Sequence, residues 1–293
     1  MLLRHIHYFL AVAEHRNFTR AAAALYVSQP ALSQQIKQLE ESLGTRLFDR
    51  SGRRITLTDA GHVYAGYARR ALRDLEEGKR AIHDVNDLSR GTLRIAITPT
   101  FTPYLIGPLV RRFHRRYANI RLQIEEMSQE RMEERLLDDD FDLGIAFDDV
   151  HNADIESRFL LEERLALVIN RDHPLAGQQS LDAPTLGTLS LALLNAEFAT
   201  REQIDSYCRQ HELQPKVMME ANSVNAVIEM VRNTPLASLL PAQVTQQRED
   251  LLALTLTPAE LKRNAVLLLR KGAYQSAAAR AFISLAEAFS AAE

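Results

Sequence analysis

Residues 29–38 carry polar side chains suited to reading DNA bases, at the spacing of an α-helix. The Gln34 amide can form a bidentate pair with adenine, and Ser33 and Gln29 can bind adjacent base edges or phosphates. The other side of the same helix carries apolar residues at steps of four, three and four: Leu32, Ile36, Leu39 and Leu43. This pattern is typical of a helix that packs by one face and enters the major groove with the other. An ordinary amphipathic helix with a solvated face would show the same periodicity.

The segments around this helix predict a helix-turn-helix. Ser28 or Gln29 can cap the helix, Pro30 is tolerated in its first turn, and Gly44 suits its left-handed end. We expect a first helix over residues 3–15 and a second that begins at Phe18. The residues predicted to contact DNA from the third helix are Ser28, Gln29, Pro30, Ser33, Gln34 and Lys37.

Residues 46–57 predict a two-stranded wing after the third helix. Ile55 and Leu57 alternate with polar residues, and Ser51 and Gly52 form a turn. Arginines near the tip can neutralise phosphates or enter a narrow minor groove: Arg50, Arg53 and Arg54. A solubilising surface hairpin is the alternative that the sequence leaves open.

The charge distribution separates the N-terminal segment from the rest of the chain. Residues 1–58 hold eight Lys or Arg and four Asp or Glu, although the 293-residue chain has a formal net charge of −3. A basic head on an acidic body is typical of a polyanion-binding domain joined to another module. The chain has one cysteine, Cys208, which excludes an intrachain disulfide and favours a cytoplasmic location. No apolar run approaches the about 20 residues of a membrane span.

Residues 59–90 predict one long helix followed by a short hinge. Apolar and small residues recur at alternating steps of four and three: Tyr64, Ala68, Ala71, Leu75, Gly78, Ile82 and Val85. This is the period of a coiled coil, so we expect the helix to pair with a second copy of the chain. Packing against the chain's own second half is the alternative.

From residue 91 onward, apolar alternation and helical periodicity take turns, which predicts an α/β sheet, mainly parallel, in two lobes. The segment 98–103 joins the end of a strand to the start of a helix, where free backbone amides favour an anion. The residues predicted to hold a small anionic effector are Thr98, Thr100, Phe101, Thr102, Ser128, Gln129, Phe198, Thr200 and Arg201. Each threonine could instead serve only as a helix cap.

The sequence contains none of the common catalytic or nucleotide-binding motifs, and we expect neither an enzyme, nor a metal site, nor a bound cofactor. The function that the residues favour is ligand-responsive transcription regulation. The alternative is a small-anion-binding or transport-associated module without promoter-specific regulation.

The segments VSQPALSQQIKQLEESLG and LFDRSGRRITLTDAG, followed by a long helix and an α/β body, resemble the LysR-type transcriptional regulators. The resemblance implies a winged helix-turn-helix domain (1–58), a dimerisation helix and hinge (59–90) and a periplasmic-binding-protein-like effector domain (91–293). It implies that lobe I comprises residues 92–161 and 267–293, and lobe II residues 162–266. It further implies a homotetramer that binds operator DNA and contacts RNA polymerase.

Within that family, the segments GKRAIHDV, RGTLRIAITPTFT, IGPL and EFATREQID are most similar to the cyanate-responsive activators of cyanate degradation. The resemblance therefore implies cyanate, or a similar small anion, as the effector. It also maps the base-contacting face to Gln29, Pro30, Ser33 and Gln34, and the wing arginine to Arg53.

Overall fold

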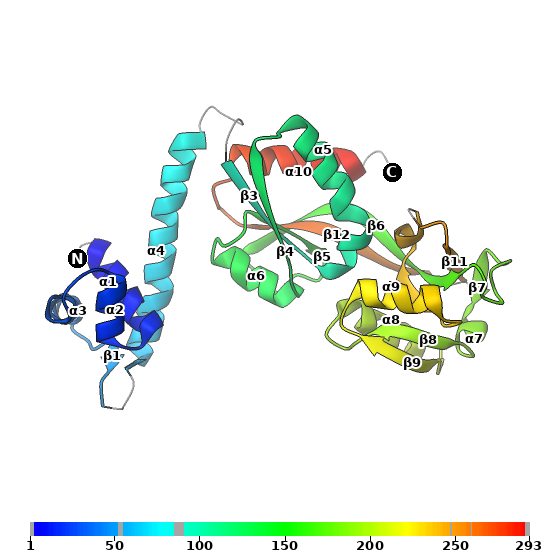
Figure 1. Cartoon of the computed structure of the whole chain (residues 1–293), viewed down its shortest axis with the longest axis horizontal. Coiled ribbons are helices and arrows are strands. Elements are labelled where there is room, and N and C mark those ends of the chain that lie inside the picture. The colour runs from blue at the N-terminus through cyan, green and yellow to red at the C-terminus, as the bar shows by residue number, and fades with distance from the viewer. Residues whose placement is uncertain (1–2, 52–54, 85–90, 247, 259, 291–293) are drawn as a thin grey trace. The chain divides into compact units, whose positions relative to one another are not determined.

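The structure is a computed structural model, and it divides into two compact units, Met1–His83 and Asp84–Glu293 (Figure 1). The residues that it describes are 3–51, 55–84, 91–246, 248–258 and 260–290.

The N-terminal unit is a winged helix-turn-helix with a long helix, as predicted. Its elements are α1 (Leu3–His15), α2 (Phe18–Ala24), α3 (Gln29–Leu43), β1 (Phe48–Asp49), β2 (Thr56–Leu57) and α4 (Asp59–Asp84). Ser28 accepts a hydrogen bond from the Ala31 amide at the start of α3, and Gly44 ends it at a φ of 66°. Because these signals act within a few residues, the expected bounds of α3 are confirmed.

The apolar face of α3 forms the centre of the first unit's core. Leu32, Ile36 and Leu39 are fully buried, whereas Leu43 lies beyond the core and is 40% exposed. The Phe9 ring packs between those of Phe48 and Tyr64, at centroid distances of 5.2 and 5.0 Å. Burial of this face leaves the polar face of α3 outward.

The base of the wing is anchored to the start of α4. The Thr58 amide donates to the Leu47 carbonyl at 3.0 Å, and the Thr58 hydroxyl donates to the Arg46 carbonyl at 2.8 Å. A Cβ atom at Gly61 would lie 2.1 Å from the Leu47 carbonyl oxygen, so only glycine permits this close approach. The predicted tip residues Arg53 and Arg54 lie outside the described residues.

The long helix α4 uses the predicted seam differently from the expectation. Ala68 is buried and Tyr64 packs on Phe9, so these seam positions serve the chain's own core. Among the α4 side chains that the structure describes, the large apolar ones that are exposed are Val63, Tyr67 and Leu75. Of the predicted seam, Tyr64 and Ala68 therefore pack in the core of the first unit, and Leu75 is exposed. Val85 lies outside the described residues.

The second unit is built on an eight-stranded sheet in the order β4-β3-β5-β12-β6-β11-β7, with β10 on β6, and a separate pair β8-β9. The strands are β3 (Gly91–Ile97), β4 (Ile120–Glu126), β5 (Leu143–Phe147), β6 (Ile155–Asn170), β7 (Ser180–Asp182), β8 (Ser190–Leu194), β9 (Lys216–Ala221), β10 (Ser238–Pro241), β11 (Leu251–Thr257) and β12 (Leu261–Arg270). Pairings with β6, and that of β5 with β12, are antiparallel. The expectation of a mainly parallel sheet is therefore wrong, because two long strands pass between the lobes in opposite directions.

Helices cover the sheet in two lobes that β6 and β12 connect (Figure 1). In lobe I, η1 (Pro99–Phe101) and the π-helical turn η2 (Thr102–Ile106) lead into α5 (Gly107–Arg116), which packs with α10 (Ala277–Ser290) in one core. The helix α6 (Gln129–Leu137) buries Met132 and Leu136 in a second core. Lobe II carries α7 (Ala183–Leu186), α8 (Ala199–Gln210), α9 (Val224–Asn233) and η3 (Ala242–Thr245). The two-lobed α/β class is confirmed.

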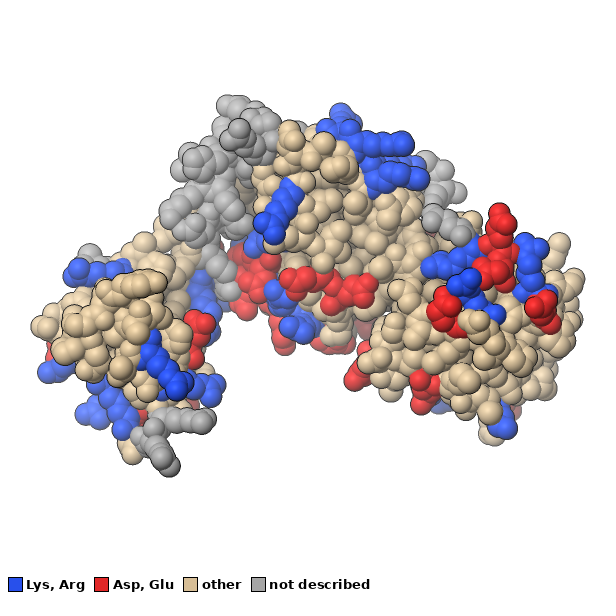
Figure 2. Space-filling view, viewed as in Figure 1, with Lys and Arg blue, Asp and Glu red and all other residues tan. Residues whose placement is uncertain are grey.

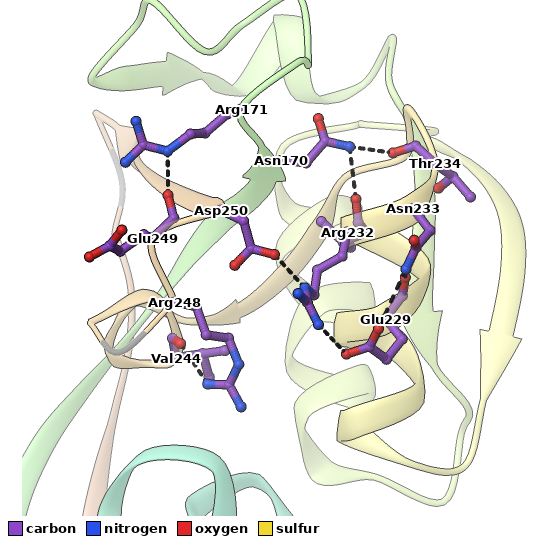
Figure 3. Close-up of polar contacts among 11 residues, drawn as sticks. Asn170, Arg171, Glu229, Arg232, Asn233, Thr234, Val244, Arg248, Glu249 and Asp250 are labelled. Carbon is purple, nitrogen blue, oxygen red and sulfur yellow. Dashed lines mark hydrogen bonds and ion pairs between the residues drawn. The ribbon is translucent and has the colours of Figure 1, made fainter.

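Polar contacts hold the far end of lobe II together (Figure 3). Asn170, the last residue of β6, donates to the carbonyls of Val231 and Thr234 at 3.0 and 2.7 Å. Arg232 pairs with both Asp250 and Glu229. These contacts join α9 to the C-terminal end of β6 and to the segment before β11.

Candidate DNA-binding surface and effector cavity

The outward face of α3 presents a continuous polar surface. The Gln29 amide donates to the Ser33 hydroxyl at 2.9 Å, one helical turn away. Gln34 is exposed, and no residue in the described ranges hydrogen-bonds its side chain. Lys37 pairs loosely with Glu41 at 3.7 Å, and both side chains are mostly exposed. The amide of Gln34 is therefore available for an external partner, whereas Ser33 is oriented by Gln29.

Arg50 occupies a more constrained position than the sequence predicts. Its Nη2 donates to Glu40 Oε2 at 2.9 Å, and its guanidinium carbon lies 5.0 Å from the Phe18 ring centroid. At the neighbouring turn, the Ser51 hydroxyl and amide donate to Asp49 and lower the pKa of that carboxyl. Arg50 thus links the wing to α3 through Glu40 in the absence of DNA.

Sequence reasoning missed Tyr26, in the turn between α2 and α3. Its side chain is 97% exposed and its backbone has a φ of 55°. A phenol at this place can donate to a phosphate oxygen beside the α3 surface. The available signal was an aromatic residue directly before a helix cap.

Surface charge differs between the two units (Figure 2). Lys and Arg are spread over the visible face of the head, whereas acidic side chains form a band over α6 and β4 on the body. The exposed acids of those elements and of the turn that follows α6 are Glu125, Glu126, Glu130, Glu134, Asp138 and Asp140. The head is therefore the better polyanion partner of the two.

The second unit contains a cavity of about 460 Å³ between its lobes. Its lining residues are Thr98, Pro99, Thr100, Met127, Ser128, Gln129, Glu130, Phe147, Glu197, Phe198, Ala199, Thr200 and Asn222. Six residues predicted from the sequence are among them: Thr98, Thr100, Ser128, Gln129, Phe198 and Thr200. The cavity is thus lined by strand ends and helix starts from both lobes.

Hydrogen-bond donors dominate the buried part of this wall. Thr100 is 1% exposed, and its hydroxyl has no partner among the described residues. Thr200 is equally buried and accepts a hydrogen bond from Arg263 at 3.0 Å. The first turns of α6 and α8 also border the cavity, and Ser128 makes no capping bond at α6. Helix N-termini with uncommitted hydroxyls favour a negatively charged ligand.

Two cavity residues have their polar groups already occupied. The Thr98 hydroxyl donates to the Ile145 carbonyl at 3.3 Å. The Gln129 side chain donates to the carbonyls of Phe147 and Asp149 at 3.1 and 2.6 Å, and accepts from the Phe147 amide. Gln129 therefore shapes the end of β5, and its side-chain amide is not free for a ligand.

Three predicted effector residues do not line the cavity. The Phe101 ring packs on Phe147 at 4.7 Å, and Thr102 lines a smaller neighbouring cavity of about 210 Å³. Arg201 donates to the Leu194 carbonyl at 3.0 Å and pairs with Asp205 and Glu220. Hydrogen bonds to Glu220 and Asp205 raise the pKa of Arg201. Arg201 is therefore committed elsewhere, because the first turn of α8 directs it along the helix.

Arg263 is a cation in contact with two residues of the cavity wall, Thr200 and Phe147, and sequence reasoning missed it. It pairs with the fully buried Glu163, and its guanidinium carbon lies 3.6 Å from the Phe147 ring centroid. Arg263 lies on β12 and Glu163 on β6, a hundred residues apart. No local pattern could have revealed this pair.

Cys208 is buried, and burial raises the pKa of its thiol. In the described ranges, no group of three or more His, Cys, Asp or Glu side chains is placed to hold a metal ion. Among the same residues, no helix combines the length and the hydropathy that crossing a bilayer requires.

Comparison with known proteins shows the class. Residues 3–62 match the helix-turn-helix domain of bacterial regulatory proteins of the lysR family, and residues 86–290 match the LysR substrate binding domain. A probable RuBisCO transcriptional regulator from Trichormus variabilis is 31% identical over 281 residues, covering 93% of this chain and 83% of that protein.

Two solved structures resemble the whole chain. Full-length OxyR from Pseudomonas aeruginosa has a TM-score of 0.72 at 25% identity, covering 98% of this chain and 94% of that one. Full-length CbnR in complex with its target DNA has a TM-score of 0.59 at 25% identity, covering 98% and 99%.

The chain belongs to the LysR family of transcriptional regulators. It is a ligand-responsive, DNA-binding regulator and not an enzyme. This conclusion favours the regulator over the stand-alone anion-binding module. The relative from Trichormus variabilis is named for RuBisCO regulation, and the cyanate expectation stays a prediction.

Proposed function

We propose that this regulator responds to a small anion bound in the cavity between its lobes, with cyanate as the first candidate. The observation that carries the proposal is the buried hydroxyl of Thr100, which has no partner in the part of the chain that the structure describes, in a cavity that Thr200 and two helix N-termini also line. A buried polar group without a partner is costly, and an anionic acceptor would satisfy it. Bicarbonate and short carboxylates share the chemistry and are alternatives to cyanate.

The DNA-binding part of the proposal assigns base contacts to Gln34, Ser33 and Gln29. Lys37 and Ser28 would contact phosphates at the edge of the groove, with Pro30 fixing the first turn of α3. Exposure of Gln34 and the outward polar face of α3 support this assignment. The wing arginines Arg50, Arg53 and Arg54 would add phosphate or minor-groove contacts.

The proposal includes a homotetramer assembled through α4, which would place several heads on one operator. Exposed apolar residues on α4 support self-association. Anion binding would shift the angle between the lobes and reposition the heads, changing contact with RNA polymerase and activating a cyanate-degradation operon. Such a response requires different anion affinities in the two arrangements. The cytoplasmic location and the predicted domain boundaries belong to this proposal as well.

The test is operator binding and transcription by the full chain, with and without sodium cyanate. In the variant Thr100→Val, which keeps the side-chain volume, we expect operator binding to persist and the anion response to disappear. A matched control is Thr185→Val in α7, whose hydroxyl is not among the cavity residues. A normal response in Thr100→Val would contradict the proposed site. If cyanate has no effect but bicarbonate does, the anion site stands and cyanate is wrong.

A further inference from the structure

Arg263 lies behind the cavity wall, on a strand that passes between the lobes. Its Nη1 donates to Thr200 Oγ1 at 3.0 Å, and its guanidinium carbon stacks 3.6 Å from the Phe147 ring centroid. Thr200 and Phe147 both line the cavity. The Arg263 side chain is 8% exposed and is not itself a lining residue. The cation therefore contacts the wall from the protein side.

A second layer of contacts fixes the orientation of this guanidinium. Glu163 is the cross-strand neighbour of Arg263, and its carboxylate accepts from Arg263 Nε and from the Tyr104 hydroxyl, the latter at 2.5 Å. The Glu163 side chain is fully buried. Arg263 Nη2 is also buried and has no hydrogen-bond partner in the described residues. The fork of Arg263 is thus held on one side by Glu163 and turned toward Thr200 on the other.

We propose that Arg263 is a positioning residue that makes the cavity selective for anions, by holding the Thr200 hydroxyl as a hydrogen-bond donor to the ligand. The inference rests on the proposed anion site. A hydroxyl has one proton, and an oxygen that accepts from a guanidinium directs that proton elsewhere. No described residue accepts a hydrogen bond from Thr200, so the cavity is the direction left for its proton. The adjacent positive charge strengthens this donor.

This arrangement defines the chemical class of the ligand. The Thr100 hydroxyl has no partner among the described residues, and the Thr200 hydroxyl accepts from Arg263 and keeps its own proton for a ligand. The carboxylates among the lining residues, Glu130 and Glu197, are exposed. A small deprotonated anion offers acceptors to each donor. A neutral amide or alcohol of the same size has N–H or O–H donors of its own. These face the threonine donors, so fewer hydrogen bonds form. The cavity should therefore distinguish cyanate from formamide by charge and not by volume.

The test is calorimetric titration of the full chain with sodium cyanate, sodium nitrate, sodium bicarbonate and formamide. Because Arg263→Met alone would leave the buried carboxylate of Glu163 without its cation, the variant is the pair Glu163→Gln with Arg263→Met. We expect anion affinity to fall about tenfold or more, since one charge-assisted hydrogen bond is lost, while formamide binding changes little. The matched control is Glu162→Gln with Arg164→Met, an exposed pair on β6 in which Arg164 Nε lies 3.0 Å from Glu162 Oε1. It should leave anion affinity unchanged.

A double-mutant cycle separates positioning from a purely structural role. If Arg263 acts through Thr200, adding Thr200→Val to the Glu163→Gln, Arg263→Met protein should cause no further loss of anion affinity. Independent, additive losses would overturn the inference. So would an unchanged anion affinity in a folded, operator-binding pair variant. A wild-type chain that binds none of the three anions would contradict the proposed function itself.

Discussion

Arg50 donates to Glu40 at 2.9 Å, so the wing is fastened to the helix that presents the DNA-reading surface. The other carboxylate oxygen of Glu40 accepts from the Leu47 and Phe48 amides at 2.8 and 3.2 Å. The Glu40 side chain is 11% exposed. One carboxylate on α3 thus satisfies two amides at the start of the wing and orients Arg50 as well.

The first prediction concerns Glu40→Ala. Removing a negative charge near DNA should raise affinity, but losing the wing anchor should lower it. Because the carboxylate is mostly buried and makes three hydrogen bonds, we expect the second effect to prevail and operator affinity to fall about tenfold. Measured operator affinity at several salt concentrations tests this, with the exposed Glu41→Ala as control. Higher affinity in Glu40→Ala would show that its charge matters more than its contacts.

The second prediction concerns Gln34→Ala. A bidentate amide contributes about 1–3 kcal/mol of discrimination between bases, so specific affinity should fall while the salt dependence of binding stays the same. Gln38→Ala is the matched control, because Gln38 lies one turn further along α3 and accepts a hydrogen bond from Gln35 at 3.1 Å. Equal loss on operator and random DNA would remove Gln34 from base reading.

The DNA-reading helix could be predicted from the sequence because its determinants are local. Ser28, Pro30 and Gly44 each act within a turn of their own position, and the leucine stripe repeats inside the same helix. The start of the crossing strand β6 at Ile155 is harder to predict, since its unbroken apolar run covers only residues 165–169. Its first half carries charged side chains on the route between lobes, where apolar alternation is interrupted.

Arg201 and Arg263 show that neighbours in the sequence do not by themselves identify the cation that contacts Thr200. Arg201 lies next to Thr200 in the sequence, yet the helix directs its guanidinium to Asp205 and Glu220. Arg263 lies far away in the sequence and reaches Thr200 through the register of β12 against β6. Proximity along the chain placed Arg201 at the cavity, but the direction of a side chain depends on the helix and on strand pairing.

The third prediction concerns self-association through α4. Val63, Tyr67 and Leu75 are 63, 66 and 50% exposed, and burying them against a second chain would be favourable. Leu75→Lys should therefore shift the assembly toward smaller species in sedimentation velocity at micromolar concentration, without lowering the melting temperature of the head. The control is His62→Lys, because His62 is an exposed residue of the same helix, whereas Ala71 is partly buried. An unchanged sedimentation profile in both Leu75→Lys and Tyr67→Lys would contradict α4 pairing.

The fourth prediction is a pH dependence of stability that arises from His173. The ring is 8% exposed, and burial lowers its pKa below the ordinary value of 6.5. Its Nδ1 accepts from the Leu175 amide at 3.2 Å, which requires this nitrogen to be unprotonated. Between the lowered folded pKa and the ordinary unfolded value, the unfolded chain binds more protons. The contribution of His173 is therefore complete above about pH 6.5 and is lost as the pH falls below it.

Urea unfolding of the second unit, at about pH 5 and at about pH 7.5, measures this contribution to the free energy of unfolding. In the wild-type chain, the free energy of unfolding should fall at the lower pH by more than in His173→Gln, because glutamine cannot take up the proton. The exposed His114→Gln should keep the wild-type difference, since the His114 side chain lies on the surface of α5. Carboxylates that also protonate in acid affect all three proteins alike, so the comparison isolates His173. The same loss of stability in His173→Gln as in the wild-type chain would show that this ring protonates without cost to the fold.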